Sequence, residues 1–219
     1  MRRSPAPSVS RADPPSIGGR LSRIDLSEFD ALLFDLDGTL VDTMPLHYRA
    51  YAQVFQERGL ALAERDYLGA VGAPARHAIP LMLRAAGATG HTEEDVAAIH
   101  RLKKGAFADI LHTTRPTALP ASRLIEPLAG SKKLAVVSSG NSDGVRAIIA
   151  SMGWSEIFDV VISGDDVVKG KPDPEPYLLA AARLGVVPAR CLVLEDAQAG
   201  LESGRAAGMS VLDVTRSGW

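Results

Sequence analysis

The sequence predicts an α/β fold in which a doubly wound parallel sheet carries an inserted α-helical cap. From residue 29 onward, short apolar runs alternate with amphipathic helical stretches, as in a Rossmann-like sheet with helical crossovers. Residues 45–119 interrupt this alternation, because they show helical periodicity but no convincing strand. We therefore expect a disordered N-terminal tail at 1–28, an α/β core formed by 29–44 and 120–219, and a helical cap at 45–119.

Five short apolar runs are the candidate strands, and each is bounded by polar or turn-forming residues, as buried parallel strands are. They span residues 31–34, 134–137, 160–162, 191–194 and 211–214. The expected core helices span about 142–152, 174–184 and 197–207. The second has clear end signals, since Asp173 suits an N-cap, Pro174 the first helical position and Gly185 the stop. In the cap, amphipathic runs at 48–55 and 93–110 predict two more helices.

Composition excludes several classes of protein. The 219 residues are 46% hydrophobic and 23% charged, as in ordinary globular proteins, and a net charge of −2 argues against a nucleic-acid partner. A single cysteine, Cys191, excludes a disulfide scaffold, and no apolar run reaches the roughly 18 residues of a membrane span. Residues 1–25 are rich in arginine, serine and proline, so we expect a tail on a cytoplasmic protein, with an organelle transit peptide as the alternative. The oligomeric state stays open, a monomer included.

The most informative segment is 31–40, where an apolar strand ends on Asp35 and Asp37 and continues into Gly38 and Thr39. A buried parallel strand has no use for acids, and ligands of α/β sheets bind at the carboxyl ends of strands. The two aspartates fall on the same side of an extended chain, so they repel each other unless a cation or a proton is held between them. This pattern indicates a metal-assisted site for an anionic substrate.

Polar residues also follow three later candidate strands. Residues 138–141, Ser-Ser-Gly-Asn, could cradle an anion with hydroxyls and backbone amides, although the same residues are ordinary turn formers. Lys171 stands between glycine and proline and could neutralise both a carboxylate and a phosphate, although an isolated loop lysine is usually solvated. Glu195 and Asp196 repeat the acid pair, and an N-cap would explain one of them but not both.

Taken together, these segments resemble the haloacid-dehalogenase superfamily motif by motif, over about residues 30–215. The residues similar to its four motifs are, in order, 35–43 (Asp-Leu-Asp-Gly-Thr-Leu-Val-Asp-Thr), Ser138, Lys171 and Glu195-Asp196. The helical insert directly after the first motif resembles the subfamily with an α-helical cap, which includes β-phosphoglucomutase and small sugar-phosphate phosphatases. The early end of the chain after 211–214 looks most like a fructose-1-phosphate-type phosphatase.

The resemblance implies a role for each acidic motif residue. Asp35 would be the nucleophile that forms an aspartyl-phosphate, and Asp37 the acid and base that protonates the leaving oxygen and then activates water. Because the family's dehalogenases lack the second aspartate, Asp37 favours phosphate esters. The cofactor implied is Mg²⁺, held by the side chains of Asp35 and Asp196, the backbone carbonyl of Asp37 and, through a water, Glu195.

The phosphate-binding residues follow from the same resemblance. Lys171 and Ser138 would hold the non-bridging oxygens of the phosphate, helped by backbone amides near Gly38 and Ser139. Asn141 belongs to the same anion-binding loop. Catalysis of this kind depends mainly on positioning and on electrostatic stabilisation.

The cap is expected to supply specificity and to exclude water. Thr43 marks the hinge into it, and His47 lies one helical turn further, where it could point back at the site or simply be a partly buried histidine. Arg76 and Lys103 are the basic cap residues that could bind a second phosphate of the substrate, with a solvated surface position as the alternative. The run 72–76 departs from the mutase pattern, in which an arginine falls nearer the glycine.

We therefore expect a Mg²⁺-dependent phosphatase that acts on a small phosphorylated metabolite, in particular a sugar phosphate such as fructose 1-phosphate. A β-phosphoglucomutase-type mutase shares all four motifs and is the first alternative. An inactive binding domain on the same fold is the second, but such a domain usually loses a motif residue, and none is missing here.

Overall fold

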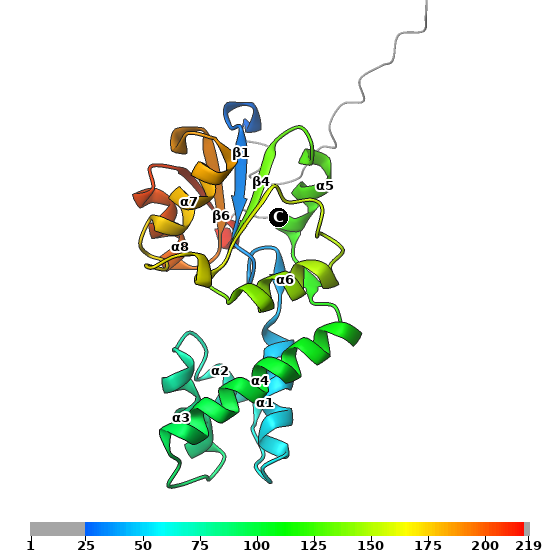
Figure 1. Cartoon of the computed structure of the whole chain (residues 1–219), viewed down its shortest axis with the longest axis vertical. Coiled ribbons are helices and arrows are strands. Elements are labelled where there is room, and N and C mark those ends of the chain that lie inside the picture. The colour runs from blue at the N-terminus through cyan, green and yellow to red at the C-terminus, as the bar shows by residue number, and fades with distance from the viewer. Residues whose placement is uncertain (1–24, 217–219) are drawn as a thin grey trace, which may run out of the picture.

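A five-stranded parallel sheet forms the centre of the computed structural model, which describes residues 25–216 (Figure 1). The strands lie in the order β5–β4–β1–β6–β7, and every neighbouring pair is parallel. They are β1 (Ala31–Phe34), β4 (Lys133–Val137), β5 (Val160–Ile162), β6 (Cys191–Glu195) and β7 (Ser210–Asp213). Because β1 lies between β4 and β6, the chain reverses its direction of winding beside β1, which is where such sheets bind ligands.

Core helices cover both faces of this sheet. They are α5 (Ile125–Leu128), α6 (Ser142–Ser151), α7 (Glu175–Leu184) and α8 (Gln198–Ala206). Leu32 and Phe34 of β1 lie in one apolar cluster with residues of α5 and α6, whereas Ala31 and Leu33 lie in a second cluster with residues of α7. All four side chains of β1 are buried, because a central parallel strand is covered on both sides. The predicted doubly wound α/β fold is thereby confirmed.

Four further helices follow one another in the sequence between the two strands of a separate antiparallel sheet. They are α1 (Met44–Gln56), α2 (Glu64–Leu68), α3 (Ala75–Ala85) and α4 (Glu93–Thr113). The small sheet pairs β2 (Val41–Asp42) with β3 (Thr117–Ala118), so the chain leaves and re-enters the core through paired strands. Figure 1 shows these helices below the central sheet, at the end where β1 leads into β2. They occupy the expected position of the cap, whose limits at residues 45 and 119 stay a prediction.

Two expectations about these segments need correction. The sequence predicts no strand in 45–119, but residues 117–118 form β3, because a two-residue strand is too short to produce a readable pattern. Residues 26–28 of the expected tail form a short 3-10 helix capped by the side chain of Asp25. The rest of the tail lies outside the described residues, and so does nearly all of the alternative transit peptide at 1–25. Within the described part of the chain, no helix combines the length and the apolar character that crossing a bilayer requires.

The two ends of α7 lie close to the capping residues that predict them in the sequence. The helix begins at Glu175 rather than at Pro174, but the carboxylate of Asp173 still accepts a hydrogen bond from the Glu175 amide at 3.0 Å. Gly185 ends the helix in a left-handed conformation with φ of 70°, as predicted. The start of this helix matters for the site, because the loop that precedes it carries Lys171.

Candidate active site

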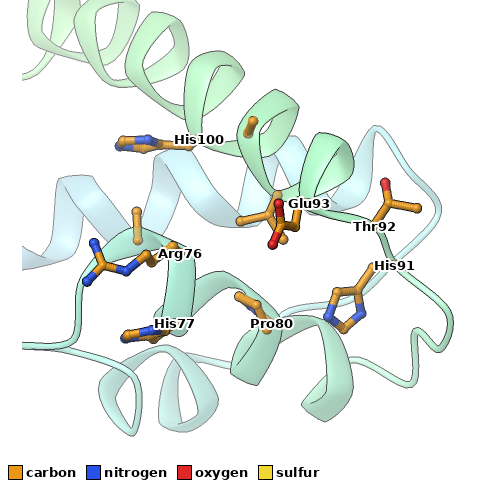
Figure 2. A pocket seen from close by; sticks show the side chains of 10 residues that line it. Arg76, His77, Pro80, His91, Thr92, Glu93 and His100 are labelled. Atoms are coloured by element: carbon orange, nitrogen blue, oxygen red, sulfur yellow. The ribbon is translucent and has the colours of Figure 1, made fainter.

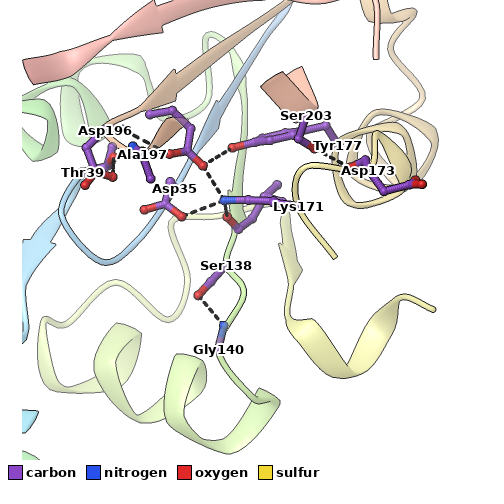
Figure 3. Close-up of polar contacts among 12 residues, drawn as sticks. Asp35, Thr39, Ser138, Gly140, Lys171, Asp173, Tyr177, Asp196, Ala197 and Ser203 are labelled. Atoms are coloured by element: carbon purple, nitrogen blue, oxygen red, sulfur yellow. Dashed lines mark hydrogen bonds and ion pairs between the residues drawn. The ribbon is translucent and has the colours of Figure 1, made fainter. Parts of the chain in front are cut away.

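The polar residues predicted at the strand ends meet at the carboxyl edge of the central sheet. Asp35 follows β1, Ser138 follows β4, and Glu195 ends β6 with Asp196 directly after it. Lys171 comes from the loop between β5 and α7, and Figure 3 shows its ammonium group pointing toward Asp35. The strand order explains this convergence, because β1 lies between β4 and β6.

The ammonium group of Lys171 is the centre of the cluster. Its Nζ donates to Oδ1 of Asp35 at 2.7 Å, to Oε1 of Glu195 at 2.6 Å and to the carbonyl oxygen of Val137 at 2.8 Å. Three acceptors use all three of its donors, and only 6% of the side chain is exposed. Burial alone would lower the pKa of Lys171, but the two carboxylates outweigh burial, so its pKa is raised and the group stays charged.

Three carboxylates beside this lysine form a candidate metal site. Oxygens of Asp35, Glu195 and Asp196 all lie within 4.8 Å of one another. Burial raises the pKa of Asp35, the Lys171 ammonium opposes this change, and the charge of Glu195 adds to it. Three acids around one lysine leave a negative charge that a divalent cation would balance, and carboxylate oxygens are the ligands that hard cations prefer.

Protein donors already engage every acceptor position of Glu195. Its Oε1 accepts from Lys171 and from the hydroxyl of Tyr177 at 3.0 Å. Its Oε2 accepts from the amides of Asp196 at 3.1 Å and of Ala197 at 3.2 Å. The side chain is 1% exposed. No acceptor position is left for a metal-bound water, so the geometry does not favour the metal role expected of Glu195.

The turn after β1 packs tightly against Asp196. The hydroxyl of Thr39 donates to Oδ1 of Asp196 at 3.1 Å. Gly38 has φ of 95°, and a Cβ at that position would overlap with the Asp196 carboxylate, so both the backbone conformation and the close approach require glycine. The amide of Gly38 donates to the carbonyl of Val41 at 2.8 Å. This amide is therefore engaged within the turn and is not available for phosphate, in contrast to the expectation for Gly38.

The side chain of Asp37 is bound to the hinge residue predicted at Thr43. The buried Thr43 hydroxyl donates to Oδ1 of Asp37. Burial raises the pKa of Asp37, whereas this hydrogen bond and the positive charge of Lys103 lower it. Asp37 also lines a cavity of about 450 Å³, and most of the other lining residues lie on α4 and α6. The carboxylate therefore faces the space in which a substrate would lie.

Two of the predicted cap residues, His47 and Lys103, reach the same cavity. Nζ of Lys103 lies 2.7 Å from Nδ1 of His47, and the imidazole stacks on Phe107 with ring centroids 4.1 Å apart. Burial and the neighbouring cation lower the pKa of His47 to about 3, so the ring is neutral and Nδ1 accepts the hydrogen bond. Burial also lowers the pKa of Lys103 to about 8. The helical unit thus brings a desolvated cation to the cavity that Asp37 lines.

The loop after β4 is only partly available for anion binding. Oγ of Ser138 is buried and accepts from the Gly140 amide at 3.0 Å, which leaves its own hydrogen free to donate. Asn141 caps α6, because its Oδ1 accepts from the Gly144 amide at 3.0 Å. Ser139 is exposed. Asn141 therefore acts as the cap of α6, and Ser138 is the residue of this loop best placed to reach a phosphate.

Arg76 lies elsewhere in the helical unit. It is exposed near the start of α3 and lines a different cavity, of about 650 Å³, together with His77 and His100. Figure 2 shows these three residues at one end of that cavity, away from His91 and Thr92 at the other. The structure therefore does not bring Arg76 to the acidic cluster or to the cavity beside Asp37, and a solvated surface position describes it better.

Three contributors to the site have no role assigned from the sequence: Tyr177, Gly200 and Thr39, although Thr39 belongs to the first motif. Tyr177 occupies a position in the helix after Lys171 at which the sequence pattern indicates nothing beyond an apolar side chain. Gly200 lies inside α8, and a Cβ there would overlap with the carboxylate of Glu195. A glycine within a helix is an available signal of close packing, because it destabilises the helix without such a reason. The contacts of Tyr177 and Thr39 leave no comparable trace in the pattern.

Comparisons with known proteins extend over both the core and the helical unit. A family model of haloacid dehalogenase-like hydrolases matches residues 29–208. A phosphorylated carbohydrates phosphatase of Thermotoga maritima is 34% identical over 182 residues, which cover 82% of each chain. The fructose-1-phosphate phosphatase YqaB of Escherichia coli is 33% identical over 187 residues, which cover 85% of this chain and 96% of the relative.

A solved structure agrees with these sequence matches. The crystal structure of a CbbY variant from Rhodobacter sphaeroides in complex with xylulose-(1,5)bisphosphate aligns with a TM-score of 0.69 at 29% identity and covers 84% of both chains. The resemblance predicted from the four motifs is confirmed. The chain belongs to the haloacid dehalogenase-like hydrolase family.

Proposed function

We propose that the chain is a Mg²⁺-dependent phosphatase that hydrolyses a small phosphorylated metabolite, in particular a sugar phosphate, through an aspartyl-phosphate on Asp35. The observation that carries the proposal is the buried ammonium of Lys171, held 2.7 Å from Asp35 at the edge of the sheet. A cation in that position allows a carboxylate to approach an anionic phosphoryl group, which like charges otherwise prevent. The similar proteins named as phosphatases support this activity. A cytoplasmic location and the oligomeric state stay predictions.

The acidic cluster fits Mg²⁺. Asp35 and Asp196 offer carboxylate oxygens close enough to share one ion, and we assign the backbone carbonyl of Asp37 to the same site, as the resemblance implies. Glu195 is left out, because protein donors engage both of its oxygens. When bound, Mg²⁺ would neutralise charge on the phosphoryl oxygens.

The side chains then divide the reaction into two displacements. The carboxylate of Asp35 attacks phosphorus, and the bond between phosphorus and the ester oxygen breaks. Asp37 gives a proton to that oxygen, which leaves as an alcohol. Asp37 next takes a proton from a water molecule whose oxygen attacks phosphorus, so the bond to Asp35 breaks and inorganic phosphate is released. Throughout, the Ser138 hydroxyl holds a non-bridging oxygen in place. Lys171, whose three donors are taken by protein acceptors, stabilises the phosphoryl charge electrostatically from its place beside Asp35.

The cavity of about 450 Å³ beside Asp37 would take the rest of the substrate. His47 and Lys103 line it from the helical unit, and Asn141 lines it from the core. Arg76, the arginine expected to bind a second phosphate, lies in the other cavity. Of the two basic cap residues expected to bind a second phosphate, only Lys103 lines the cavity beside Asp37, so we favour a monophosphate ester over the bisphosphate-dependent mutase alternative.

The test is the release of inorganic phosphate from a panel of sugar phosphates and from p-nitrophenyl phosphate. Purified protein is stripped of metal with EDTA and assayed with and without added Mg²⁺. We expect activity only with Mg²⁺, and at least about 1,000-fold less in Asp35→Asn. Asp30→Asn is the matched control, since Asp30 is exposed and pairs with Arg190, and its activity should stay within about two-fold.

Three outcomes would contradict the proposal. Phosphate release by Asp35→Asn would rule out Asp35 as the nucleophile. Full activity after EDTA treatment would rule out the metal. Conversion of β-glucose 1-phosphate to glucose 6-phosphate, with no free phosphate, would identify a mutase.

A further inference from the structure

Tyr177 places a hydroxyl inside an apolar layer beside the proposed catalytic residues. The residue is 0% exposed on α7 and packs in the cluster that contains Leu33 and Ala180. A buried hydroxyl carries a free-energy penalty unless it is hydrogen-bonded, and this one donates to Oε1 of Glu195 at 3.0 Å. Phenylalanine would fill the same space without that requirement. The hydrogen bond to Glu195 is therefore what distinguishes tyrosine from phenylalanine at this position.

Tyr177 contacts both members of the ion pair between Lys171 and Glu195. Nζ of Lys171 lies over the Tyr177 ring, 5.1 Å from its centre, and the same nitrogen lies 2.6 Å from Oε1 of Glu195. The ring confines the ammonium group and the hydroxyl confines its acceptor. Because the ammonium also lies 2.7 Å from Asp35, a displacement of Glu195 would move the cation that faces the nucleophile.

Glu195 is confined from other directions as well. The amides of Asp196 and Ala197 hold its Oε2. The backbone of α8 packs so closely at Gly200 that a Cβ there would overlap with the carboxylate. Of these contacts, the hydroxyl of Tyr177 is the one that a substitution can remove while every charge and the backbone stay in place.

We propose that Tyr177 is a positioning residue, which fixes Glu195 so that this carboxylate holds Lys171 instead of turning toward a cation at Asp35 and Asp196. The inference rests on the proposed phosphatase function and assigns different tasks to the two acids of the fourth motif. The Asp196 carboxylate binds the cation, and the Glu195 carboxylate holds Lys171 in place. Without the Tyr177 hydroxyl, Oε1 keeps a single donor, and the carboxylate is freer to move toward the cation.

Tyr177→Phe tests the inference, because it removes the hydroxyl and keeps the ring. With the best phosphate ester of the wild type, we expect kcat to fall about 10-fold and KM to stay within about two-fold. The Kd for Mg²⁺ alone, measured by isothermal titration calorimetry, should not weaken. Tyr48→Phe is the matched control: its hydroxyl donates to the carbonyl of Leu62 at 3.1 Å in the helical unit, and kcat should stay within about two-fold.

Two results with Tyr177→Phe would overturn the inference. One is an unchanged kcat. The other is a loss of kcat accompanied by an equal weakening of Mg²⁺ binding, since Glu195 would then belong to the cation site. Circular dichroism shows whether the variant is folded.

A second pair of variants decides the question even if Tyr177→Phe fails to fold. Glu195→Gln and Asp196→Asn each remove one charge from neighbouring positions, so the difference between them reports direct contact with the cation. We expect Asp196→Asn to weaken Mg²⁺ binding at least about 10-fold more than Glu195→Gln does. An equal or reversed order would overturn the inference.

The wild-type protein separates this inference from the proposed function. If it releases phosphate from none of the esters, the proposed phosphatase function fails. If it is active and the variants behave otherwise than expected, only the roles of Tyr177 and Glu195 fail.

Discussion

Replacing Lys103 with methionine is expected to stabilise the fold and to lower the activity. The ammonium group lies 2.7 Å from Nδ1 of a neutral His47, and 5.3 and 4.8 Å from the ring centres of Tyr51 and Phe107. Among residues 25–216, it forms no ion pair within 4.0 Å. Burial lowers the pKa of Lys103 to about 8, because the charge of Asp37 offsets only part of the cost of removing the ammonium from water. The group thus opposes folding.

The free energy follows from the pKa difference. Lowering the pKa from 10.5 to about 8 corresponds to about 3 kcal/mol at pH 7, at about 1.4 kcal/mol per pKa unit. The hydrogen bond to His47 and the contacts with the two ring faces, which methionine cannot replace in full, offset about 1–2 kcal/mol of this cost. Methionine keeps an apolar stem in the same place. We therefore expect Lys103→Met to raise the free energy of unfolding at pH 7 by about 1–2 kcal/mol.

The pH dependence identifies the cause of this gain. Between about pH 8 and pH 10.5, the unfolded lysine still holds a proton that the folded one has lost, so the stability of the wild type rises with pH across this window. Methionine does not titrate. The advantage of Lys103→Met should therefore be constant below about pH 8 and vanish above about pH 10.5.

Urea unfolding followed by circular dichroism at pH 7 and at about pH 10.5 measures the difference. Because Lys103 lines the cavity beside Asp37, we expect kcat/KM for phosphate release to fall at least about 10-fold. Lys104→Met is the matched control: Lys104 is exposed on the same helix, and its replacement should change stability by at most about 0.5 kcal/mol. If Lys103→Met is no more stable than the wild type at pH 7, or if its advantage persists at the higher pH, burial of the Lys103 charge does not destabilise the fold.

Close packing elsewhere leads to two further predictions. Gly38→Ala should lower the free energy of unfolding in urea by about 1–3 kcal/mol, because alanine disfavours φ of 95° and its Cβ overlaps with Asp196. Gly59→Ala, at φ of 72° in open space, carries only the backbone cost, and an equal loss there would contradict the overlap. Burial raises the pKa of Cys191 to about 11, so iodoacetamide at pH 8 should label the protein only in urea, as mass spectrometry would show. Labelling of the native protein would mean that β6 opens readily.

The central sheet was predictable because each of its strands leaves a local signature. Residues 31–34 and 191–194 are buried on both faces, so they read as unbroken apolar runs, and the observed strands match them within one residue. Residues 117–118 behave differently. They are exposed, they number two, and they form a strand only because β2 lies beside them. Whether residues 117–118 form a strand therefore depends on their pairing with β2 and not on their own sequence.

The site residues of the core were predictable for a related reason. The acidic residues and Ser138 lie at or just after the ends of apolar runs, and parallel strands place these ends at one edge. Lys171 lies further along the chain, in the loop between β5 and α7. The cap residues lack this constraint. His47 and Lys103 are 56 positions apart, and only the packing of α1 against α4 brings them together. Arg76 was an equally plausible basic residue on an amphipathic helix, but its helix faces another cavity. Periodicity shows that a helix has a buried face without showing what that face meets.

Lys171 and Lys103 show how the chain separates chemistry from recognition. Lys171 gives its three donors to three protein acceptors, and its pKa is raised, so its position does not depend on a ligand. Lys103 has a neutral imidazole and two rings for partners, and its pKa is lowered, so its charged form gains most from an anion that enters the cavity. Because Lys171 is held in place before a substrate binds, it can act on any phosphate ester that reaches Asp35. Lys103, which forms no ion pair with any residue that the structure describes, instead favours an ester whose own groups supply an anionic partner. Substrate selectivity should therefore reside in the helical unit, where residues can change while the geometry around Asp35 stays the same.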